Sequence, residues 1–369
     1  MVFVIDADFE KMFGSKSAII QAPGAGLSQE DQMLMEFLKQ SAPRIVVAGT
    51  GGSGSNTINR MQEIGIMGAS LVAMNTDAQH LLRVKAHKKL LLGKKKTKGL
   101  GAGSNPEVGE AAAEESEQEI KQVVEGADLV FVTAGMGGGT GTGSAHIIAK
   151  AAKECGAVVI AIVTMPFTSE GKKRAANAAG GLEKLRKHAD TTIAIPNDKL
   201  LYFVPDLPLN AAFKVADSVL ANAVKGIAEL ITKPGLVNLD FADMRTILER
   251  GGMAVIGLGE VSGTEGKDRV IQAAERALAS PLLDVDYTNA DRALINVSGA
   301  EDLTLGEAES AVSAVAAKIH KDAHIIWGAT IDNSMEKRAV RVLCVLAGIK
   351  EGPQAQKEPE ESLEGVEFI

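Results

Sequence analysis

The stretch GMGGGTGTG, residues 135–143, decides the fold because six of its nine residues are glycine and it separates two different sequence patterns. Residues 128–134 form a short apolar, β-branched run that is typical of a buried strand. Residues 144–153 carry apolar side chains at helical spacing, and Gly156 provides a stop signal. The sequence therefore predicts a strand, a glycine loop and a helix, in that order.

A glycine loop in this position is suited to bind phosphate. Glycines let successive backbone N–H groups point at one small region, and the following helix adds about half a positive charge at its N-terminus. Thr140 and Thr142 add hydroxyl donors, so a polyphosphate can be held without a lysine in the loop. The simpler alternative is a tight turn alone, but a strand-to-helix turn needs only one or two glycines.

Length and composition indicate a globular chain of about two domains. The 369 residues are 46% hydrophobic but only 4% aromatic, so the core must consist of Ala, Val, Ile and Leu, as in parallel α/β layers. A net charge of −8 argues against general binding to nucleic acid or anionic membranes. The two cysteines exclude a disulfide framework and a Cys-rich metal site. Because no apolar run is long enough to span a bilayer and no signal-peptide pattern is present, we expect a cytoplasmic protein without direct membrane insertion.

A second glycine loop follows a strand predicted at residues 44–49. The glycines of residues 49–54 match the dinucleotide fingerprint G-x-G-x-x-G, and a helix is predicted to start at Thr57. The next predicted strand ends at Asn75 and Asp77, close to where a Rossmann fold places its ribose-binding acid. An NAD-dependent oxidoreductase is therefore an alternative at this point.

A third glycine loop, residues 99–105, opens a helix predicted over residues 106–124. Three such loops are more than one Rossmann half needs. A single polyphosphate bound from several sides is the simpler explanation for all three. The basic run at residues 94–98 could steer an anion, although a solvated loop is the more ordinary interpretation. The sequence contains no G-x-x-x-x-G-K-[ST] motif, so it is not that of a P-loop enzyme.

Two pairs of residues, each pair one helical turn apart, are candidates for contacts to a nucleotide. Glu170 and Arg174 form either an ordinary ion pair or contacts to a ribose hydroxyl and a phosphate. Phe213 and Asp217 lie on one face of the long helix predicted over Leu209–Thr232, where they can stack on a base and accept its N–H donors. Only guanine offers adjacent N1–H and N2–H donors to a carboxylate, so such a site would reject other bases.

Acidic residues follow that long helix. Asn238 and Asp240 precede another predicted helix, and Asp243 stands in its first turn. Acidic side chains at a helix start normally accept hydrogen bonds from its free N–H groups. The pattern alone therefore favours capping over catalysis.

The rest of the chain is predicted to form a second, smaller α/β unit. Its predicted strands are residues 252–257, 293–299, 324–331 and 339–347, and its predicted helices are residues 267–279 and 304–319, the latter with a capping box. The expected organisation is an N-terminal arm and helix (1–43), a nucleotide-binding domain (44–208), a central helix (209–232), a C-terminal domain (233–350) and a disordered tail (351–369). The apolar end of that tail is a candidate docking peptide.

Together, the three glycine loops and the sequence NLDFAD at residues 238–243 resemble the FtsZ family of tubulin-like GTPases. GGGTGTG is the hallmark of the tubulin and FtsZ superfamily, and N-x-D-F-A-D after a long helix is typical of its FtsZ branch. The resemblance covers residues 44–348, while the N-terminal extension and short tail are more similar to archaeal members. It implies a Rossmann-like, parallel-sheet GTP-binding domain, a long central helix and a second α/β domain.

The resemblance also implies roles for individual residues. The phosphates would be held by Gly51, Gly52, Gly101, Ala102, Gly103, Gly138, Gly139, Thr140 and Gly141. The other contacts to GTP or GDP would come from Glu170 and Arg174 at the ribose and phosphate, from Asn56, Asn197, Phe213 and Asp217 around guanine, and from Asn75 and Asp77.

Catalysis in this family implies two subunits. The loop with Asn238, Asp240 and Asp243 would reach the nucleotide of the next subunit in a head-to-tail polymer, where it would position water for attack on the γ-phosphate. Mg²⁺ would be held mainly by phosphates and water, with no protein metal site. The expected protein is a GTPase of the division ring at mid-cell, with a membrane-anchor or division protein on its tail. A related filament that shapes the cell is an alternative.

One residue departs from the family pattern. His146 stands where many relatives have proline. Proline near a helix start is not required for phosphate binding, so we expect altered packing without loss of function.

Overall fold

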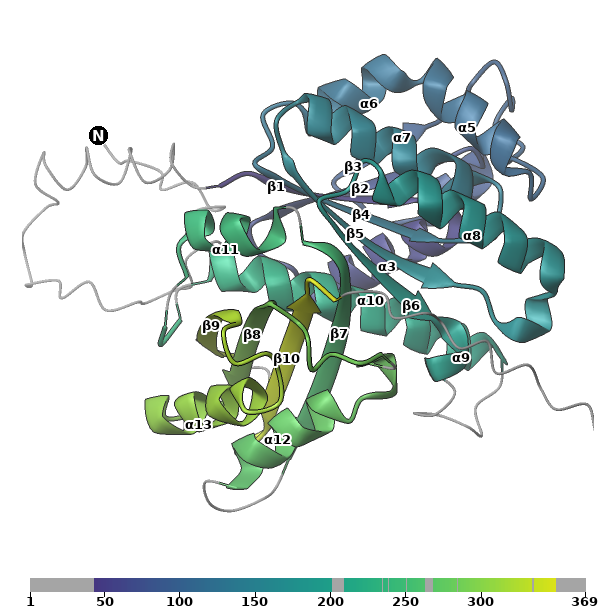
Figure 1. The fold of residues 1–369 in the computed structure, drawn as a ribbon. Helices are drawn as coiled ribbons and strands as arrows, with labels where there is room; N and C mark the ends of the chain where they lie inside the picture. Colours follow the sequence, from purple (N-terminus) through teal and green to yellow (C-terminus); the bar gives the residue numbers. More distant parts are fainter. Residues whose placement is uncertain are drawn as a thin grey trace, which may run out of the picture.

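The computed structural model describes residues 43–200, 209–233, 235–237, 239–249, 251–262, 268–283, 285–333 and 335–349, without the side chains of residues 209–212. These residues form one ten-stranded sheet with the order β3-β2-β1-β4-β5-β6-β7-β10-β8-β9 (Figure 1). The strands are β1 (Ile45–Thr50), β2 (Ala69–Asn75), β3 (Lys88–Leu91), β4 (Leu129–Gly135), β5 (Val158–Met165), β6 (Thr191–Pro196), β7 (Gly252–Val261), β8 (Arg292–Gly299), β9 (His324–Ile331) and β10 (Val340–Ala347).

The first six strands are all parallel and follow the order 3-2-1-4-5-6 of a doubly wound nucleotide-binding fold. The predicted parallel α/β architecture is confirmed. Strand β1 pairs with both β2 and β4, so the strand order reverses at β1. The carboxyl ends of β1 and β4 therefore lie side by side. Those are the ends that carry the first glycine loop and the GMGGGTGTG loop.

Helices cover both faces of this sheet, as the near-continuous apolar strands require. The helices are α3 (Gly51–Ile64), α4 (Ala78–Arg83), α5 (Pro106–Glu115), α6 (Glu117–Val124), α7 (Thr140–Glu154), α8 (Lys172–Arg186), α9 (Asn197–Leu200), α10 (Leu209–Thr232), α11 (Phe241–Leu248), α12 (Asp268–Leu278) and α13 (Leu305–Ala316). Alternate residues of β1 show the two layers: Ile45 and Val47 pack with α3 and α10, whereas Val46 and Ala48 pack with α5, α6 and α7.

Helix α10 has the predicted bounds and joins the two parts of the chain. Its buried residues, among them Leu220 and Val224, pack in one apolar cluster with strands of both parts of the sheet. Strand β10 shows the arrangement clearly, because Leu343 and Val345 belong to the α10 side while Val342 and Cys344 belong to the cluster with α12 and α13. The helix therefore serves as a shared core element for both parts.

The C-terminal strands continue the same sheet. Strand β7 pairs in parallel with β6 through residues 252–254 and 191–193, and the strands beyond it form a mixed parallel and antiparallel arrangement. All four predicted strands and both predicted helices of this part are present, although β7 extends to Val261. The exact division of the chain into domains stays a prediction.

The two edges of the sheet are β3 and β9. Strand β3 is four residues long and begins with the exposed Lys88 and Lys89. Strand β9 is bridged on its outer side by Val237, whose carbonyl accepts the Ala329 N–H at 3.4 Å, while the Leu236 N–H donates to the Ala329 carbonyl at 2.8 Å. The segment that leads to the acidic residues is thus attached to the edge of the sheet.

Three predicted helix boundaries are wrong, each because tertiary packing overrides local propensity. Helix α3 begins at Gly51 and not at Thr57, since its glycines allow direct contact with the sheet: a Cβ on Gly54 would lie 2.4 Å from the Thr133 carbonyl oxygen. Helix α7 likewise begins at Thr140 instead of residue 144. The helix predicted over residues 106–124 is two helices, because it breaks at Ser116, whose hydroxyl accepts a hydrogen bond from the Gly93 N–H at 3.0 Å.

His146 is buried in α7, and the altered packing relative to proline-bearing relatives stays a prediction. Its Nε2 lies 3.1 Å from Glu110 Oε1, and its ring stacks on His188 with centroids 6.5 Å apart. Burial lowers the pKa of His146, and the nearby Glu110 carboxylate only partly opposes this effect. Burial therefore favours the neutral form of the ring.

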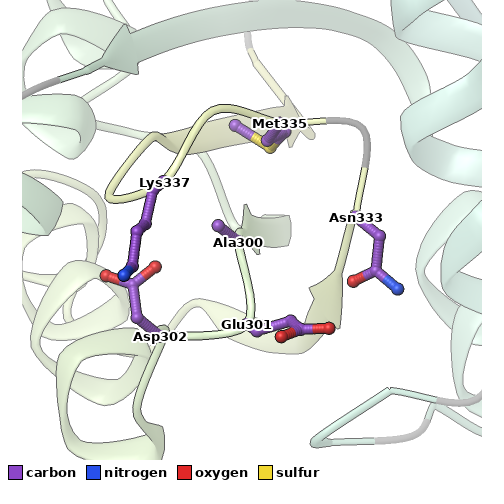
Figure 2. A pocket seen from close by; sticks show the side chains of 6 residues that line it. All are labelled: Ala300, Glu301, Asp302, Asn333, Met335 and Lys337. Atoms are coloured by element: carbon purple, nitrogen blue, oxygen red, sulfur yellow. The ribbon is translucent and has the colours of Figure 1, made fainter.

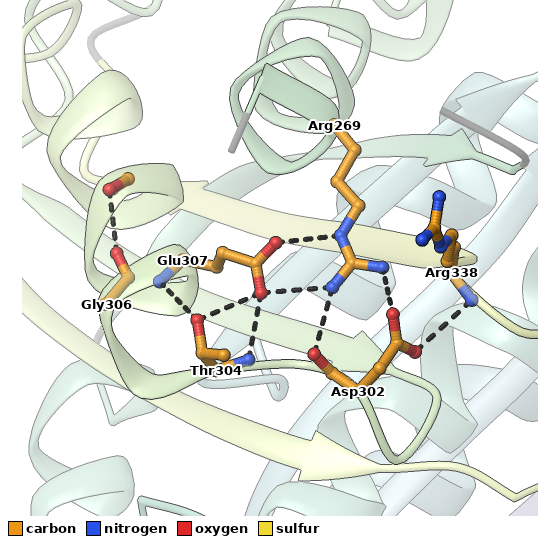
Figure 3. A network of polar contacts seen from close by, with 7 residues as sticks. Arg269, Asp302, Thr304, Gly306, Glu307 and Arg338 are labelled. Atoms are coloured by element: carbon orange, nitrogen blue, oxygen red, sulfur yellow. Dashed lines mark hydrogen bonds and ion pairs between the residues drawn. The ribbon is translucent and has the colours of Figure 1, made fainter. Parts of the chain in front are cut away.

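A cluster of ion pairs links α12 to α13 and to the loop before α13 in the C-terminal part of the chain (Figure 3). The guanidinium of Arg269 on α12 makes a bidentate contact with Glu307, at 2.8 Å to Oε1 and 3.0 Å to Oε2, and donates to Asp302 Oδ2 at 2.6 Å. Glu307 also completes the predicted capping box with Thr304 at the start of α13. Burial would raise the pKa of Glu307, but hydrogen bonds from Arg269 and Thr304 outweigh it and lower that pKa.

Several sequence predictions lie outside the described residues: most of the N-terminal arm, Asn238 and the C-terminal tail. Within the described ranges, no helix combines the length and apolar character needed to cross a bilayer.

We predict that Arg269→Leu lowers the free energy of unfolding by about 3–5 kcal/mol at pH 7, because it leaves the buried Glu307 carboxylate without its counter-charge. Arg276→Leu is the matched control, since this arginine lies on the same helix and is exposed. Urea unfolding of both variants measures the effect. A loss below about 1 kcal/mol for Arg269→Leu would show that the cluster contributes little to stability.

Candidate functional site

The first glycine loop and the GMGGGTGTG loop meet in space above the adjacent ends of β1 and β4. A Cβ on Gly51 would lie 2.7 Å from the Gly141 nitrogen, so the two loops are in direct contact. Beside this contact is a cavity of about 370 Å³. Its lining residues are Gly52, Ser53, Asn56, Gly135, Met136, Gly138, Gly139, Thr140, Gly141, Thr164, Pro166, Glu170, Arg174, Asn197, Phe213, Ala216 and Asp217.

Two helices begin at this cavity without a side-chain cap. Neither Thr50 at the start of α3 nor Gly139 at the start of α7 has a capping side-chain hydrogen bond within the described structure. Among the neighbouring helices, Asp77 caps α4 and Asn105 caps α5, whereas α6 and α8 also lack a capping side-chain hydrogen bond. Uncapped helix N-termini present free N–H groups and a partial positive charge, and this arrangement binds anions.

The glycines around the cavity have two different roles. A Cβ on Gly139 or Gly141 would collide with neighbouring protein atoms, at 2.8 Å from Ala102 Cβ and 2.8 Å from the Gly135 carbonyl oxygen respectively. By contrast, a Cβ on Gly52 or Gly138 would meet no described protein atom within 4 Å. The first pair allows close packing of the loops, while the second pair leaves open space in the cavity wall where a ligand fits.

The threonine hydroxyls are not the free donors that the sequence predicts. Thr142 Oγ1 is buried and accepts a hydrogen bond from the Gly137 N–H at 2.8 Å, so it shapes the loop from inside. Thr140 lines the cavity, but its Oγ1 lies 2.6 Å from Thr76 Oγ1. Backbone N–H groups therefore remain the main donors at this end of the cavity.

Glu170 and Arg174 both line the cavity, and they form the ion pair that their spacing allows. Glu170 Oε1 also accepts a hydrogen bond from the Phe167 N–H at 2.9 Å, which orients the carboxylate. A ribose or phosphate bound here would meet side chains that are already held in place.

The opposite end of the cavity carries an aromatic ring, a carboxylate and an amide. Phe213 on α10 is 38% exposed, and its ring packs edge-on against Phe167 with centroids 5.3 Å apart. Asp217 lies one turn further along α10, where Thr57 Oγ1 donates to Oδ1 at 3.4 Å. Asn197 is only 5% exposed, yet its Oδ1 has no hydrogen-bond partner among the described atoms.

The environment of Asp217 changes its acidity. Burial raises the pKa of its carboxyl to about 7, against hydrogen bonds from Thr57 and Ser53 that act to lower it. The half-buried Asp217 carboxyl therefore lies beside an exposed aromatic face and near a buried amide oxygen that has no partner among the described atoms. A flat ligand with several N–H donors would satisfy both oxygen-bearing groups.

Other predicted site residues do not line the cavity. The Asp77 carboxylate accepts the His80 N–H at 3.0 Å as the cap of α4, and the Asn75 side chain contacts the ring of His80 at 3.1 Å. Gly51 is buried in the contact between the two loops. The third loop does not line the cavity either. Its Ala102 packs against Gly139, and the residues on either side of Ala102, Gly101 and Gly103, have positive φ.

The basic run beside the third loop is a solvated surface. Lys94 Nζ pairs with Glu119 at 2.8 Å, and the backbone N–H groups of Lys95 and Lys96 each donate to the Glu115 carboxylate at 2.9 Å. The more ordinary of the two interpretations of this run therefore fits the structure.

The acidic candidates lie at the other end of α10. Asp240 caps α11 by accepting the Ala242 N–H at 3.1 Å, as the pattern predicts, and Asp243 is exposed in the first turn. At about 1.5 Å per residue, the helical rise from Asp217 to Thr232 is roughly 20 Å. The acidic residues therefore lie far from the cavity of their own chain.

Sequence reasoning missed several lining residues. Thr164 and Pro166 flank the end of β5, and a signal for them was available, because carboxyl ends of parallel strands gather at one edge. Ser53 stands inside the first glycine loop, and Ala216 precedes Asp217 on α10. Gly135 and Met136 belong to the opening stretch but had no assigned contact.

Another cavity, of about 430 Å³, lies at the ends of β8 and β9 (Figure 2). Its lining residues are Ala300, Glu301, Asp302, Asn333, Met335 and Lys337. It contains neither a glycine loop nor an aromatic ring, and Asp302 is already bound to Arg269. Of these two cavities, only the first has the chemistry expected for a nucleotide.

Comparisons with known proteins agree with this assignment. Residues 44–205 match the model of the Tubulin/FtsZ family, GTPase domain, and residues 252–350 match that of the FtsZ family, C-terminal domain. The chain is 55% identical to Cell division protein FtsZ 1 of Archaeoglobus fulgidus over 327 residues, covering 89% of this chain and 88% of that protein. It is 53% identical to the protein of the same name from Thermococcus kodakarensis, covering 92% and 90%.

A solved structure, the empty FtsZ dimer of M. jannaschii, superposes with a TM-score of 0.83 at 54% identity and covers 88% of this chain and 93% of that one. The oxidoreductase alternative is set aside, because the matched nucleotide-binding domain is that of GTPases. This chain belongs to the Tubulin/FtsZ family, in its archaeal FtsZ branch, and is a GTPase of the cell-division cytoskeleton.

Proposed function

We propose that this protein converts GTP to GDP and phosphate at a site that is completed only when two subunits stack head to tail. The separation of the two halves carries the proposal. The nucleotide cavity lies at the start of α10, whereas Asp240 and Asp243 are exposed beyond its end, and α10 itself rises by roughly 20 Å from Asp217 to Thr232. A carboxylate at that distance acts on the nucleotide of a neighbouring subunit.

The cavity is proposed to bind GTP along its length. The polyphosphate lies over the uncapped starts of α3 and α7, in the space left by Gly52 and Gly138. Arg174 and Glu170 hold the middle of the nucleotide. Phe213 stacks on guanine, and the Asp217 carboxylate accepts its N1–H and N2–H donors, as its position and the buried, unsatisfied surroundings favour.

Among the described lining residues, neither carboxylate is placed to act as the base for hydrolysis. Glu170 is paired with Arg174, and Asp217 lies at the base end. Asp240 and Asp243 of the next subunit, together with Asn238, are therefore proposed to orient the attacking water. Catalysis then consists of positioning and of charge stabilisation by backbone donors.

Mg²⁺ is proposed to enter with the nucleotide. Among the described residues, no group of three or more His, Cys, Asp or Glu side chains could hold a metal ion, so phosphate oxygens and water must supply most of its ligands. When bound, the ion neutralises charge that develops on the phosphates.

This arrangement links hydrolysis to assembly. Hydrolysis requires a neighbour, and loss of the γ-phosphate removes a group at the subunit contact, so turnover favours disassembly. We further propose that the filaments form the division ring at mid-cell and that the C-terminal tail binds a membrane-anchor or division protein.

We predict that Asp240→Asn and Asp243→Asn each lower GTP turnover by at least about a hundredfold while GTP still binds. Asparagine at position 240 remains a good helix cap, so Asp240→Asn removes charge without removing the contact to α11. Turnover per subunit is measured across a range of protein concentrations with Mg²⁺ present.

In the unchanged protein, turnover per subunit should vanish below a threshold concentration. Glu249→Gln is a control, because it changes an acidic residue just after α11. A rate per subunit that is independent of concentration, or full turnover in both aspartate variants, would refute the split site.

We predict that Gly138→Ala weakens GTP binding by at least about tenfold and leaves stability unchanged, because the new methyl group meets open cavity and no protein atom. Gly180→Ala is the matched control, since a Cβ there also meets no described atom within 4 Å but lies on α8 away from the lining. Equilibrium binding of GTP and thermal unfolding are measured together. Equal GTP affinity in both variants would exclude phosphate contact at Gly138.

We predict that GTP affinity rises with pH to a plateau above about 7, since guanine needs the ionised form of Asp217. Below that pH the carboxyl is protonated in the free protein, and affinity falls by about tenfold for each pH unit. Asp217→Asn should bind GTP more weakly and lose this dependence. GTP affinity is measured from pH 5.5 to about 8.5 in the unchanged protein and in Asp217→Asn, which separates the contribution of Asp217 from that of the phosphates. The same pH dependence in both proteins would contradict the contact between Asp217 and guanine.

A further inference from the structure

A chain of directed hydrogen bonds runs from the protein backbone to the nucleotide cavity. The Asp77 N–H donates to Asn75 Oδ1 at 3.2 Å, Asn75 Nδ2 lies 3.1 Å from His80 Nδ1, and His80 Nε2 lies 3.1 Å from Asn56 Oδ1. Only Asn56 lines the cavity. His80, in the middle of the chain, has no role in the site described above.

The direction of each bond follows from the first one. A backbone N–H can only donate, so the Asn75 atom that faces it is the oxygen, and its NH₂ group faces His80. Since that NH₂ group also can only donate, His80 Nδ1 must accept. The neutral ring then carries its proton on Nε2.

The second half of the chain fixes Asn56. The Nε2–H of His80 donates to Asn56, so the carbonyl oxygen of that side chain points at the imidazole. Because Asn56 lines the cavity and its oxygen is bound to His80, its NH₂ group is the part of the amide left for a ligand there. The next residue, Thr57, contacts Asp217, which places Asn56 near the base end.

We infer that His80 is a positioning residue that holds the Asn56 amide with its NH₂ group toward the nucleotide, so that Asn56 recognises a hydrogen-bond acceptor on the guanosine. The inference rests on the proposed binding of GTP in this cavity. Guanosine would then be recognised by two kinds of hydrogen bond: Asn56 donates to an acceptor on the ligand, and Asp217 accepts from its N–H donors. Without His80, the amide can rotate and present its oxygen to the same acceptor.

The test compares two nearly isosteric substitutions. In His80→Gln, the side-chain oxygen can accept from Asn75 while its NH₂ group donates to Asn56. In His80→Glu, the contact with Asn75 remains possible, but only acceptors face Asn56, and its amide must reverse. We expect GTP affinity within about twofold of the unchanged protein for His80→Gln and at least about tenfold weaker for His80→Glu.

Gln79→Glu controls for the added negative charge, because Gln79 is the exposed neighbour of His80. This control should keep GTP affinity within about threefold. Thermal unfolding without nucleotide checks that each variant folds. Equal GTP affinity in His80→Gln and His80→Glu would overturn the inference, as would a loss in Gln79→Glu as large as that in His80→Glu.

A double-mutant cycle separates positioning from a merely structural role. His80→Ala should weaken GTP binding about three- to tenfold in the unchanged background but have no further effect in an Asn56→Ala background. Additive effects of the two substitutions would overturn the inference even if His80→Glu fails to fold. If the unchanged protein does not bind GTP, the proposed function fails, whereas GTP binding without coupling refutes only the role of His80.

Discussion

The structure depends on the contact between two helix starts that glycine alone makes possible. Helices α3 and α7 leave the neighbouring ends of β1 and β4, and a Cβ on Gly51 would lie 2.7 Å from the Gly141 nitrogen. Two partial positive charges and two sets of free N–H groups are thereby held close together, which is unfavourable until an anion lies between them. No side-chain cap is present at the start of either helix in the described structure, so those donors are left for a ligand.

Helix α10 connects the nucleotide cavity to the segment that carries the acidic residues. It contributes Phe213 and Asp217 to the cavity at one end, packs against both parts of the sheet along its length, and leads to Asp240 at the other. Because a helix is rigid and its rise is constant, the distance between the binding half and the acidic half is fixed within one subunit. In the proposed function, stacking of two subunits brings the two halves together without requiring the chain to fold back on itself.

Much of the fold could be predicted from the sequence, because apolar strands and glycine loops have strong local signals. The bounds of α10, the capping box at Thr304 and the parallel strands follow from periodicity and cap residues. The starts of α3 and α7 could not be predicted, since glycine has low helix propensity and only contacts with distant strands stabilise it there. In the site, Gly138, Phe213 and Asp217 reach the cavity as expected, but Asn75 and Asp77 turn to His80 and α4, local partners whose geometry the sequence does not reveal.

The edges of the sheet have a consequence for a protein that works at high local concentration in a filament. An open strand edge pairs readily with another chain. Here β3 is short and carries exposed Lys88 and Lys89, and β9 is bridged at Ala329 by the segment that precedes Asp240. Like charges repel sheets that approach along β3, and the bridge occupies backbone groups on β9. Both edges are thus protected against uncontrolled pairing between sheets, which would favour end-to-end growth in the proposed filament over side-by-side aggregation.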